Sequence, residues 1–264
     1  MQRQCRSRVG RCEPRPRLFP ARTGIPRWSA SRSQPQSGRE TRNRRLFALF
    51  SLCLIVATTA LPQDAVPVEE DPFHRTVFKN DYVQAFRVTL EPGRATGMHT
   101  HARDDVAVRL SSATTAAENL GQPVGPPQHG DAGLVGARNN GAKPLTHRVH
   151  NVGNTVYDVV DVQILSRPAG PPAPAISPPA AENASMRVYR YELGPGVASA
   201  QHTHARPYVI LAATNADLRM TSPDGPSMDH AVKAGDIHWV DSAVTHTLAN
   251  RGSDKAILVE IELK

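Results

Sequence analysis

The sequence predicts an all-β protein built from two similar barrels in tandem. Short segments rich in β-branched and aromatic residues recur along the chain, and none beyond residue 67 keeps a helical apolar period for more than two turns. A motif of glycine and histidine also occurs once in each half. A chain of 264 residues has room for two domains of roughly 100 residues each.

The expected strands are 82–90, 105–110, 156–165, 186–193, 208–214 and 257–263. Several alternate apolar and polar residues, as strands with one buried face do. Turn sequences with Pro and Gly lie between them, for example at 91–93 and 194–196. Residues 119–141 are rich in Gly and Pro and weak in strand pattern. We therefore expect the first barrel to be looser, with a more open pocket, and the alternative is a decayed copy retained for packing.

A Pro- and Ala-rich segment divides the body of the chain. Residues 167–183 hold six prolines and no strand pattern, which is typical of a stiff linker. The predicted organisation is a leader over 1–60, a first barrel over 73–166, a linker over 167–184 and a second barrel over 185–264.

The two halves are copies of one domain. Gly93-x5-His99-Thr-His101 reappears as Gly196-x5-His202-Thr-His204, an offset of 103 residues. Further along, Gly136-x10-His147-x3-Asn151 reappears as Gly235-x10-His246-x3-Asn250, an offset of 99 residues. Gly136 and Gly235 are interpreted as turn residues, which need conformational freedom. Asn151 and Asn250 are expected to brace the loop or the third histidine.

The repeated histidines form a candidate metal site in each half. Side chains two residues apart on a strand point to the same face, so the pairs His99/His101 and His202/His204 each project together. A third histidine, His147 or His246, would join them from a neighbouring strand. Three imidazoles can hold a divalent metal and leave positions open for water or substrate. The body contains no cysteine, since Cys5, Cys12 and Cys53 all lie in the leader, so thiolate ligands are excluded there.

These motifs resemble the paired signatures of the cupin superfamily: a glycine, five residues, His-x-His, a glutamate, and later a glycine followed by His-x3-Asn. The second half is also similar to small single-domain bacterial cupins. The resemblance implies two double-stranded β-helix (jelly-roll) barrels in tandem, a bicupin, with the metal inside each barrel near one mouth.

The chain departs from the cupin pattern at the glutamate. Asp105 stands there in the first repeat and Tyr208 in the second. Asp105 is expected to coordinate the metal directly, to coordinate it through water, or to orient a histidine. Tyr208 is expected to act as a hydrogen-bonding wall. The resulting prediction is three histidines with Asp105 in site one and three histidines alone in site two, and Tyr208 and Asp105 are the candidates for acid–base help.

The leader accounts for the basic charge. Residues 1–45 hold thirteen arginines and two acids, so the rest of the chain carries −4 of the net +7. An acidic body with few aromatic residues argues against nucleic-acid binding. The basic flank, the apolar run 46–60 and the small residues near Ala60 are typical of a secretory signal peptide. We expect a secreted or periplasmic protein, with membrane contact only through an uncleaved leader.

Two classes of function follow from the motifs. The first is a metal-dependent enzyme acting on a small molecule, either as a dioxygenase-like centre or as a Lewis-acid isomerase or lyase. The second is an exported binding module that captures a small ligand or a metal without turnover, and a storage role is a third alternative. The metal could be Fe, Mn, Ni, Zn or Cu. Neither the substrate nor a homo-oligomeric state is fixed by the motifs.

Overall fold

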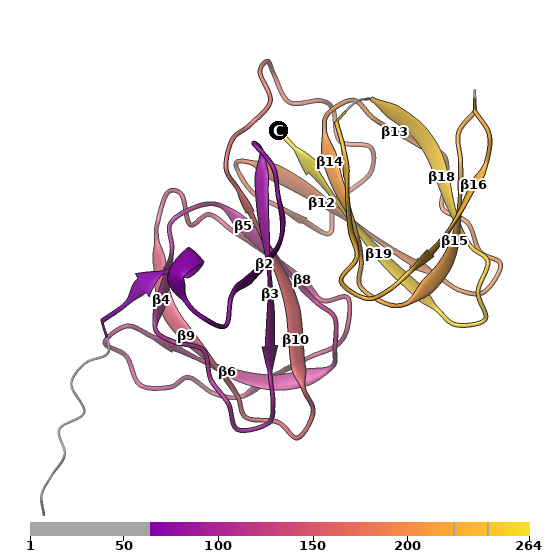
Figure 1. Ribbon diagram of the computed structural model, residues 1–264. Helices are drawn as coiled ribbons and strands as arrows, with labels where there is room; N and C mark the ends of the chain where they lie inside the picture. The colour runs from indigo at the N-terminus through magenta and orange to yellow at the C-terminus, as the bar shows by residue number, and fades with distance from the viewer. Residues whose placement is uncertain (1–63, 224, 242) are drawn as a thin grey trace, which may run out of the picture. The chain divides into compact units, whose positions relative to one another are not determined.

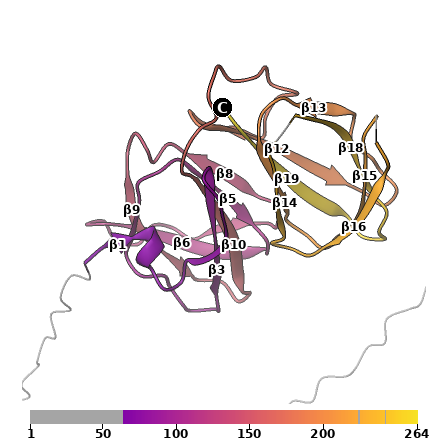
Figure 2. The ribbon, with the colours of Figure 1, turned by 45° about the horizontal axis from the view of Figure 1, so that its top comes forward.

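The computed structural model describes residues 64–264, except 224 and 242, and these residues belong to one compact unit. The predicted leader over 1–60 lies outside the described residues. Almost all regular structure is β (Figures 1 and 2). No helix in the described part of the chain has the length and apolar character needed to cross a membrane.

Barrel one consists of two facing sheets with a short 3-10 helix, η1 (Val68–Glu70), at its start. One sheet has the order β1 (Val66–Pro67), β4 (His99–His101), β9 (Leu145–Asn151), β6 (Ala113–Asn119) and β7 (Gln128–Gly130). The other has the order β2 (Arg75–Lys79), β3 (Val83–Leu90), β10 (Tyr157–Ile164), β5 (Asp105–Arg109) and β8 (Val135–Arg138).

Barrel two repeats this arrangement. One sheet has the order β11 (Ala181–Glu182), β12 (Met186–Leu193), β19 (Ala256–Leu263), β14 (Tyr208–Ala212) and β17 (Ile237–Val240). The other has the order β13 (His202–His204), β18 (Val244–Asn250), β15 (Ala216–Thr221) and β16 (Met228–Val232). The two jelly-roll barrels expected from the sequence are therefore confirmed.

The central strands β10 and β19 are buried on both faces. Alternate residues of β10 (Val160, Val162) and of β19 (Val259, Ile261) join one apolar cluster that contains strands of both barrels. Because side chains alternate across a strand, the intervening positions face the barrel interiors. These include Asp161 and the buried acid Glu260. The contact between barrels thus explains why the outward face of each central strand is apolar, whereas the inward face carries a carboxylate.

The boundaries of the barrels differ from the expected ones. β11 lies within the predicted linker and pairs with β12. At the start of barrel one, β1 and η1 precede residue 73, and β1 pairs in parallel with the histidine strand β4. Residues 66–72 therefore belong to barrel one.

The expectation of a turn at Gly136 is wrong, because Gly136 lies within β8. The turn residue is Gly133, which has a φ of 80° and donates to the carbonyl of Arg109. Gly235 has a φ of 94° and donates to the carbonyl of Ala212, the equivalent contact in barrel two. Such φ values favour glycine. The sequence alignment placed the first turn three residues too late.

Candidate metal centres

The histidines of site two come from two adjacent strands. His202 on β13 pairs directly with His246 on β18, and His204 follows two residues after His202 on the same face. In each ring Nδ1 has a neighbour. His202 Nδ1 is 2.9 Å from the carbonyl of Ala200, His204 Nδ1 is 2.9 Å from Glu262 Oε2, and His246 Nδ1 is 3.3 Å from Met220 Sδ. Contacts of this kind fix the ring and leave Nε2 free for a ligand.

The three Nε2 atoms converge on Glu260, which β19 projects into the barrel. Oε2 of Glu260 lies 3.1 Å from Nε2 of His202 and 2.9 Å from Nε2 of His204, and Oε1 lies 3.1 Å from Nε2 of His246. Nε2 of His246 is 2.8 Å from Nε2 of His202. These four residues offer ligand atoms that all lie within 4.8 Å of one another. Sequence reasoning missed Glu260 and left this site without a carboxylate.

This cluster fits a divalent metal. Ligand atoms around a tetrahedral ion with bonds of about 2.0–2.1 Å are roughly 3.3 Å apart, and the four distances given above, 2.8–3.1 Å, are close to that value. Among the described residues, Glu260 Oε1 is buried and has no hydrogen bond of good geometry. An unsatisfied carboxylate oxygen among imidazole nitrogens is an open position for a cation. Histidine nitrogen with carboxylate oxygen suits Zn, Fe, Ni or Cu.

Site two contains a buried negative charge that is surrounded by imidazoles. Burial alone would raise the pKa of Glu260, but the neighbouring imidazoles of His202, His204 and His246 hold that pKa well below its usual value. Burial alone would lower the pKa of His204, but its contacts with Glu260 and Glu262 raise it to about 9. The protein therefore keeps an ionised carboxylate in this barrel.

Two tyrosines cover the rings of site two. Tyr208 stacks on His204, with ring centroids 3.9 Å apart and an interplanar angle of 18°. Tyr191 stacks on His202, and its hydroxyl lies 3.2 Å from Nε2 of that ring. Burial and the charge of Glu260 raise the pKa of both phenols. Tyr208 thus packs on a ligand ring, and Tyr191 is an additional proton-bearing group that sequence reasoning missed.

The histidines of site one are arranged differently. His99 and His101 on β4 bring their Nε2 atoms to 3.1 Å. His147 on β9 lies beside them, with ring centroids 4.8 Å from His99 and 5.2 Å from His101. Two sets in barrel one have ligand atoms within 4.8 Å of one another: His74, His99 and His101, and His101, Asp105 and Asp161. The buried His74 comes from the segment before β2 and was not among the predicted site residues.

Asp105 holds the far side of His101. Its Oδ2 accepts from His101 Nδ1 at 3.0 Å and from Asn140 Nδ2 at 2.9 Å, and its Oδ1 accepts from Arg138 Nε at 2.5 Å. Burial and the neighbouring Asp161 raise the pKa of Asp105, against the opposing effects of His101 and Arg138. Of the three roles expected for Asp105, these contacts favour the orientation of a histidine.

Asp161 is the counterpart of Glu260 in barrel one. Asp161 on β10 pairs with Ala107 on β5, as Glu260 on β19 pairs with Ile210 on β14. In barrel one, however, Arg138 Nη2 donates to Asp161 Oδ2 at 2.6 Å. Burial favours the protonated form of Asp161, but the guanidinium and nearby histidines hold its pKa below the usual value. A protein cation thus occupies the carboxylate side of site one.

Asn151 and Asn250 make the same contacts in the two barrels. The amide of Asn151 donates to the carbonyls of Leu90 and Thr155, and its Oδ1 accepts from the backbone of Gly153. Asn250 contacts the equivalent backbone groups of Leu193, Asp254 and Gly252. All these partners are backbone atoms of the loops, so each asparagine braces its loop.

The interior of barrel two is more open than that of barrel one, which reverses the expectation. The cavity next to site one has a volume of about 30 Å³, whereas the cavity of barrel two has about 540 Å³. In barrel one the guanidinium of Arg109 lies 5.0 Å from the ring centroid of Tyr157. The aligned positions in barrel two hold Ala212 and Ala256, both buried. Smaller side chains leave this interior unfilled.

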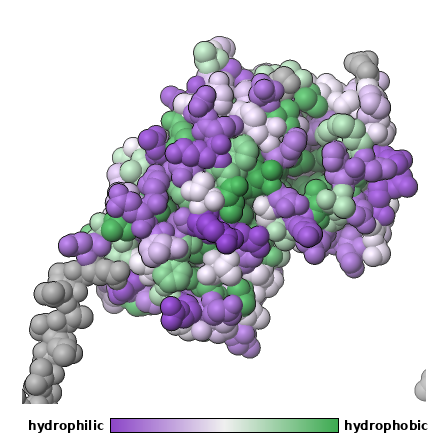
Figure 3. Space-filling model, in the orientation of Figure 1, coloured by the Kyte–Doolittle hydropathy of each residue, from purple (hydrophilic) through white to green (hydrophobic). Residues whose placement is uncertain are grey.

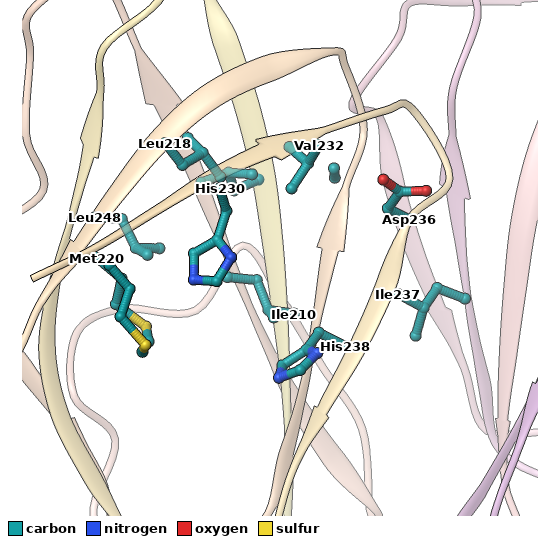
Figure 4. Close-up of a pocket in the computed structure, with 12 residues that line it drawn as sticks. Ile210, Leu218, Met220, His230, Val232, Asp236, Ile237, His238 and Leu248 are labelled. Carbon is teal, nitrogen blue, oxygen red and sulfur yellow. The ribbon is translucent and has the colours of Figure 1, made fainter.

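The cavity of barrel two adjoins site two. Met220, which contacts His246, and Ile210, which pairs with Glu260, both line it. His230 on β16 and His238 on β17 point into it from facing strands (Figure 4). The remaining wall is mostly apolar, and the space-filling view shows hydrophobic residues in this hollow with hydrophilic residues around them (Figure 3).

The chain has limited similarity to known proteins. No family model matches the chain. Over 84 residues it is 29% identical to the "Beta-alanine degradation protein BauB" of Pseudomonas aeruginosa, covering 31% of this chain and 86% of that protein.

Three solved structures illustrate the similarity. AerE from Microcystis aeruginosa is 11% identical, with 74% of this chain and 98% of that chain covered and a TM-score of 0.48. A cupin domain from Bordetella pertussis is 25% identical, with 38% and 97% covered and a TM-score of 0.31. A mutant of salicylate 1,2-dioxygenase from Pseudoaminobacter salicylatoxidans in complex with gentisate is 12% identical, with 72% and 74% covered and a TM-score of 0.44. The chain itself consists of two β barrels, each of which carries one copy of the histidine motif.

Proposed function

We propose that this protein is an exported, metal-dependent bicupin that acts on a small molecule at site two. The observation that carries the proposal is the convergence of three imidazole Nε2 atoms on the buried carboxylate of Glu260. Every ring in this set has its Nδ1 engaged elsewhere, which is the arrangement expected of metal-ligating histidines. The leader supports export, to the periplasm or the exterior, as a further part of the proposal.

A metal in this site would supply Lewis acidity or a centre for O2 chemistry. The chain's own groups have separate tasks. Tyr191 holds a proton at its hydroxyl, close to Nε2 of His202. Tyr208 shields the ring of His204. Burial keeps both phenols protonated at neutral pH, so Tyr191 is suited to donate a hydrogen bond to a bound oxygen anion.

The cavity of barrel two supports a small-molecule substrate. A volume of about 540 Å³ is in the range of ligand sites, which are mostly apolar with a few polar groups that fix orientation. The polar side chains of the lining are His230, His238 and Asp236, and Figure 4 shows the two histidines on facing walls. A molecule with an apolar body and one hydrogen-bonding end matches this lining.

Glu260 counts against a non-catalytic binding module. That alternative drew its support from the missing glutamate in both motifs, and in barrel two β19 supplies a glutamate from another strand.

Metal analysis followed by turnover assays tests the proposal. The full chain is loaded separately with Fe, Mn, Ni, Zn and Cu, and O2 uptake and product formation are measured with small carboxylates. β-Amino acids come first, because of the name of the curated relative. We expect turnover in the unmodified chain and its loss in the Glu260→Gln variant. Tight retention of a ligand with no product under any metal would contradict the enzymatic role and favour the binding module.

A further inference from the structure

Barrel one carries a histidine outside both repeated motifs. His74 follows η1 and is 8% exposed. Its ring centroid lies 4.3 Å from that of His99 and 5.8 Å from that of His101. The aligned part of barrel two is the Pro- and Ala-rich segment 167–184, which contains no histidine. His74 is therefore particular to barrel one.

Asp71 orients His74 and lies beside His99. Its Oδ2 is hydrogen-bonded to His74 Nδ1 at 2.7 Å and lies 3.3 Å from His99 Nδ1, which is hydrogen-bonded to the carbonyl of Gly97 at 3.0 Å. His101 is held in the same manner on the other side, where its Nδ1 faces Asp105. All three rings therefore have an acceptor at Nδ1, which fixes the tautomer that leaves Nε2 available.

The space between these rings is the size of an ion or a water molecule. The cavity of about 30 Å³ is lined by His74, His99, His101 and Asp161, among others. A site of this size can hold one such occupant if it has polar partners. Asp161 Oδ1 is buried and lacks a hydrogen-bond partner among the described residues, which is a second sign that the cavity takes a polar occupant.

We propose that the divalent metal expected at site one takes His74 as a further imidazole ligand, and that this bond fastens the segment 66–74 to barrel one. This inference does not depend on the function proposed for site two. Imidazole ligands suit Zn, Cu, Fe or Ni. The carboxylates Asp105 and Asp161 remain with Arg138, so they balance a protein cation while the histidines bind the metal.

The segment 66–74 already packs on barrel one, so a metal bond to His74 would hold it there more firmly. Val66 and Pro67 pair with His99 and Thr100. Glu69 accepts a hydrogen bond from Gln163 at 2.8 Å, and the segment then ends at His74. A metal that joins His74 to His99 and His101 adds a cross-link between this segment and β4. Ligand binding to the closed state reduces its opening by mass action.

A zinc competition experiment tests the ligand role. The full chain is loaded with Zn²⁺, and a chelator of known affinity removes the two equivalents in turn. His74→Ala should weaken one equivalent by more than about 100-fold, because loss of a ligand exceeds the 10–100-fold cost of losing a group that only orients one. Asp71→Asn should weaken the same equivalent by about 10–100-fold.

Two further variants serve as controls. His129 is an exposed histidine of barrel one, and His129→Ala should leave both affinities unchanged. His74→Gln preserves more of the volume if His74→Ala fails to fold, and retention of the site-two equivalent reports an intact chain. An unchanged affinity in a folded His74 variant would overturn the proposal and leave site one to the motif histidines alone.

Limited proteolysis tests the cross-link. Glu69 and Glu70 are exposed, so a glutamyl endopeptidase can cleave there once the segment opens. Zn²⁺ should slow this cleavage at least about tenfold in the unmodified chain and in the His202→Ala/His204→Ala variant, but not in His74→Ala. Zinc protection that persists in His74→Ala, or that is lost with His202 and His204, would contradict the proposal.

Discussion

The two barrels share one plan and differ in what neutralises the interior carboxylate. In barrel two, Glu260 faces three imidazoles and has an oxygen without a good hydrogen bond. In barrel one, the aligned Asp161 is bound by Arg138, and the histidines are joined by His74. One duplicated strand position thus holds the proposed metal ligand in one copy and the partner of an arginine in the other.

The interiors of the two barrels also differ in how much empty space they contain. Barrel one is filled by Arg109 and Tyr157, while Ala212 and Ala256 leave barrel two a cavity beside its metal site. The copy with the carboxylate ligand is also the copy with room for a substrate. We infer that the duplication separated a reaction barrel from a supporting barrel.

Removal of the histidine pair of site two should have the largest effect. His202→Ala/His204→Ala takes away two of four ligands, so about one equivalent of metal per chain and all turnover should be lost. Barrel one should retain its own equivalent. Elemental analysis of the purified variant measures this, and an unaltered metal content would refute the assignment of site two.

Arg138→Met should destabilise barrel one. It leaves the buried carboxylates of Asp105 and Asp161 without their cation, and loss of one partner of a buried pair costs about 3–5 kcal/mol. Urea unfolding gives the free energy. The control is Arg219→Met in barrel two, which breaks an exposed pair with Asp229 and should cost about 1 kcal/mol or less. Equal losses of unfolding free energy in the two variants would contradict the conclusion that barrel one depends on a buried ion pair.

Glu260→Gln should weaken metal binding while it preserves the shape of the site. The amide removes the negative charge but keeps an oxygen that can still bind the metal, so the effect should be smaller than the loss of a whole ligand, and we expect an affinity lower by about 10–100-fold at site two alone. Asp161→Asn, the matched change in barrel one, should alter metal affinity much less because Arg138 is its partner. Chelator competition measures the metal affinity of both variants. A larger effect of Asp161→Asn would contradict the assignment of Glu260 as the carboxylate ligand.

The smallest expected effect concerns an ion pair that only barrel one has. Glu118 on β6 faces Arg148 on β9, whereas Thr221 faces Thr247 at the matching place in barrel two. Hydrogen bonds from Arg148 and His150 lower the pKa of Glu118 to about 2. Glu118→Gln should therefore cost about 0.5–1 kcal/mol at pH 7.

This cost should depend on pH in one direction. A depressed carboxyl pKa stabilises the fold above the unfolded value of 4.5, and the contribution is lost as the pH falls toward 2. The difference in unfolding free energy between Glu118→Gln and the unmodified chain should thus shrink below pH 4.5. A difference that grows in acid would contradict the assigned pair.

The fold and the motif histidines could be predicted from the sequence because they repeat. The strand alternation and the matched spacing of His99, His101, His202 and His204 each appear twice. Glu260 was missed because it lies in a strand that pairs with the motif strand β14, and such pairing is not visible in the spacing. Two acids in the apolar strand 256–263 were the available signal. His74 has no repeat partner, so only the packing of segment 66–74 reveals it.

Anomalous diffraction from a metal-loaded crystal would locate the metal and identify its ligands. We expect a metal peak in barrel two about 2.0–2.2 Å from Nε2 of His202, His204 and His246 and from a carboxylate oxygen of Glu260. A peak bound by the histidines with Glu260 turned away, or no peak in barrel two, would contradict this expectation.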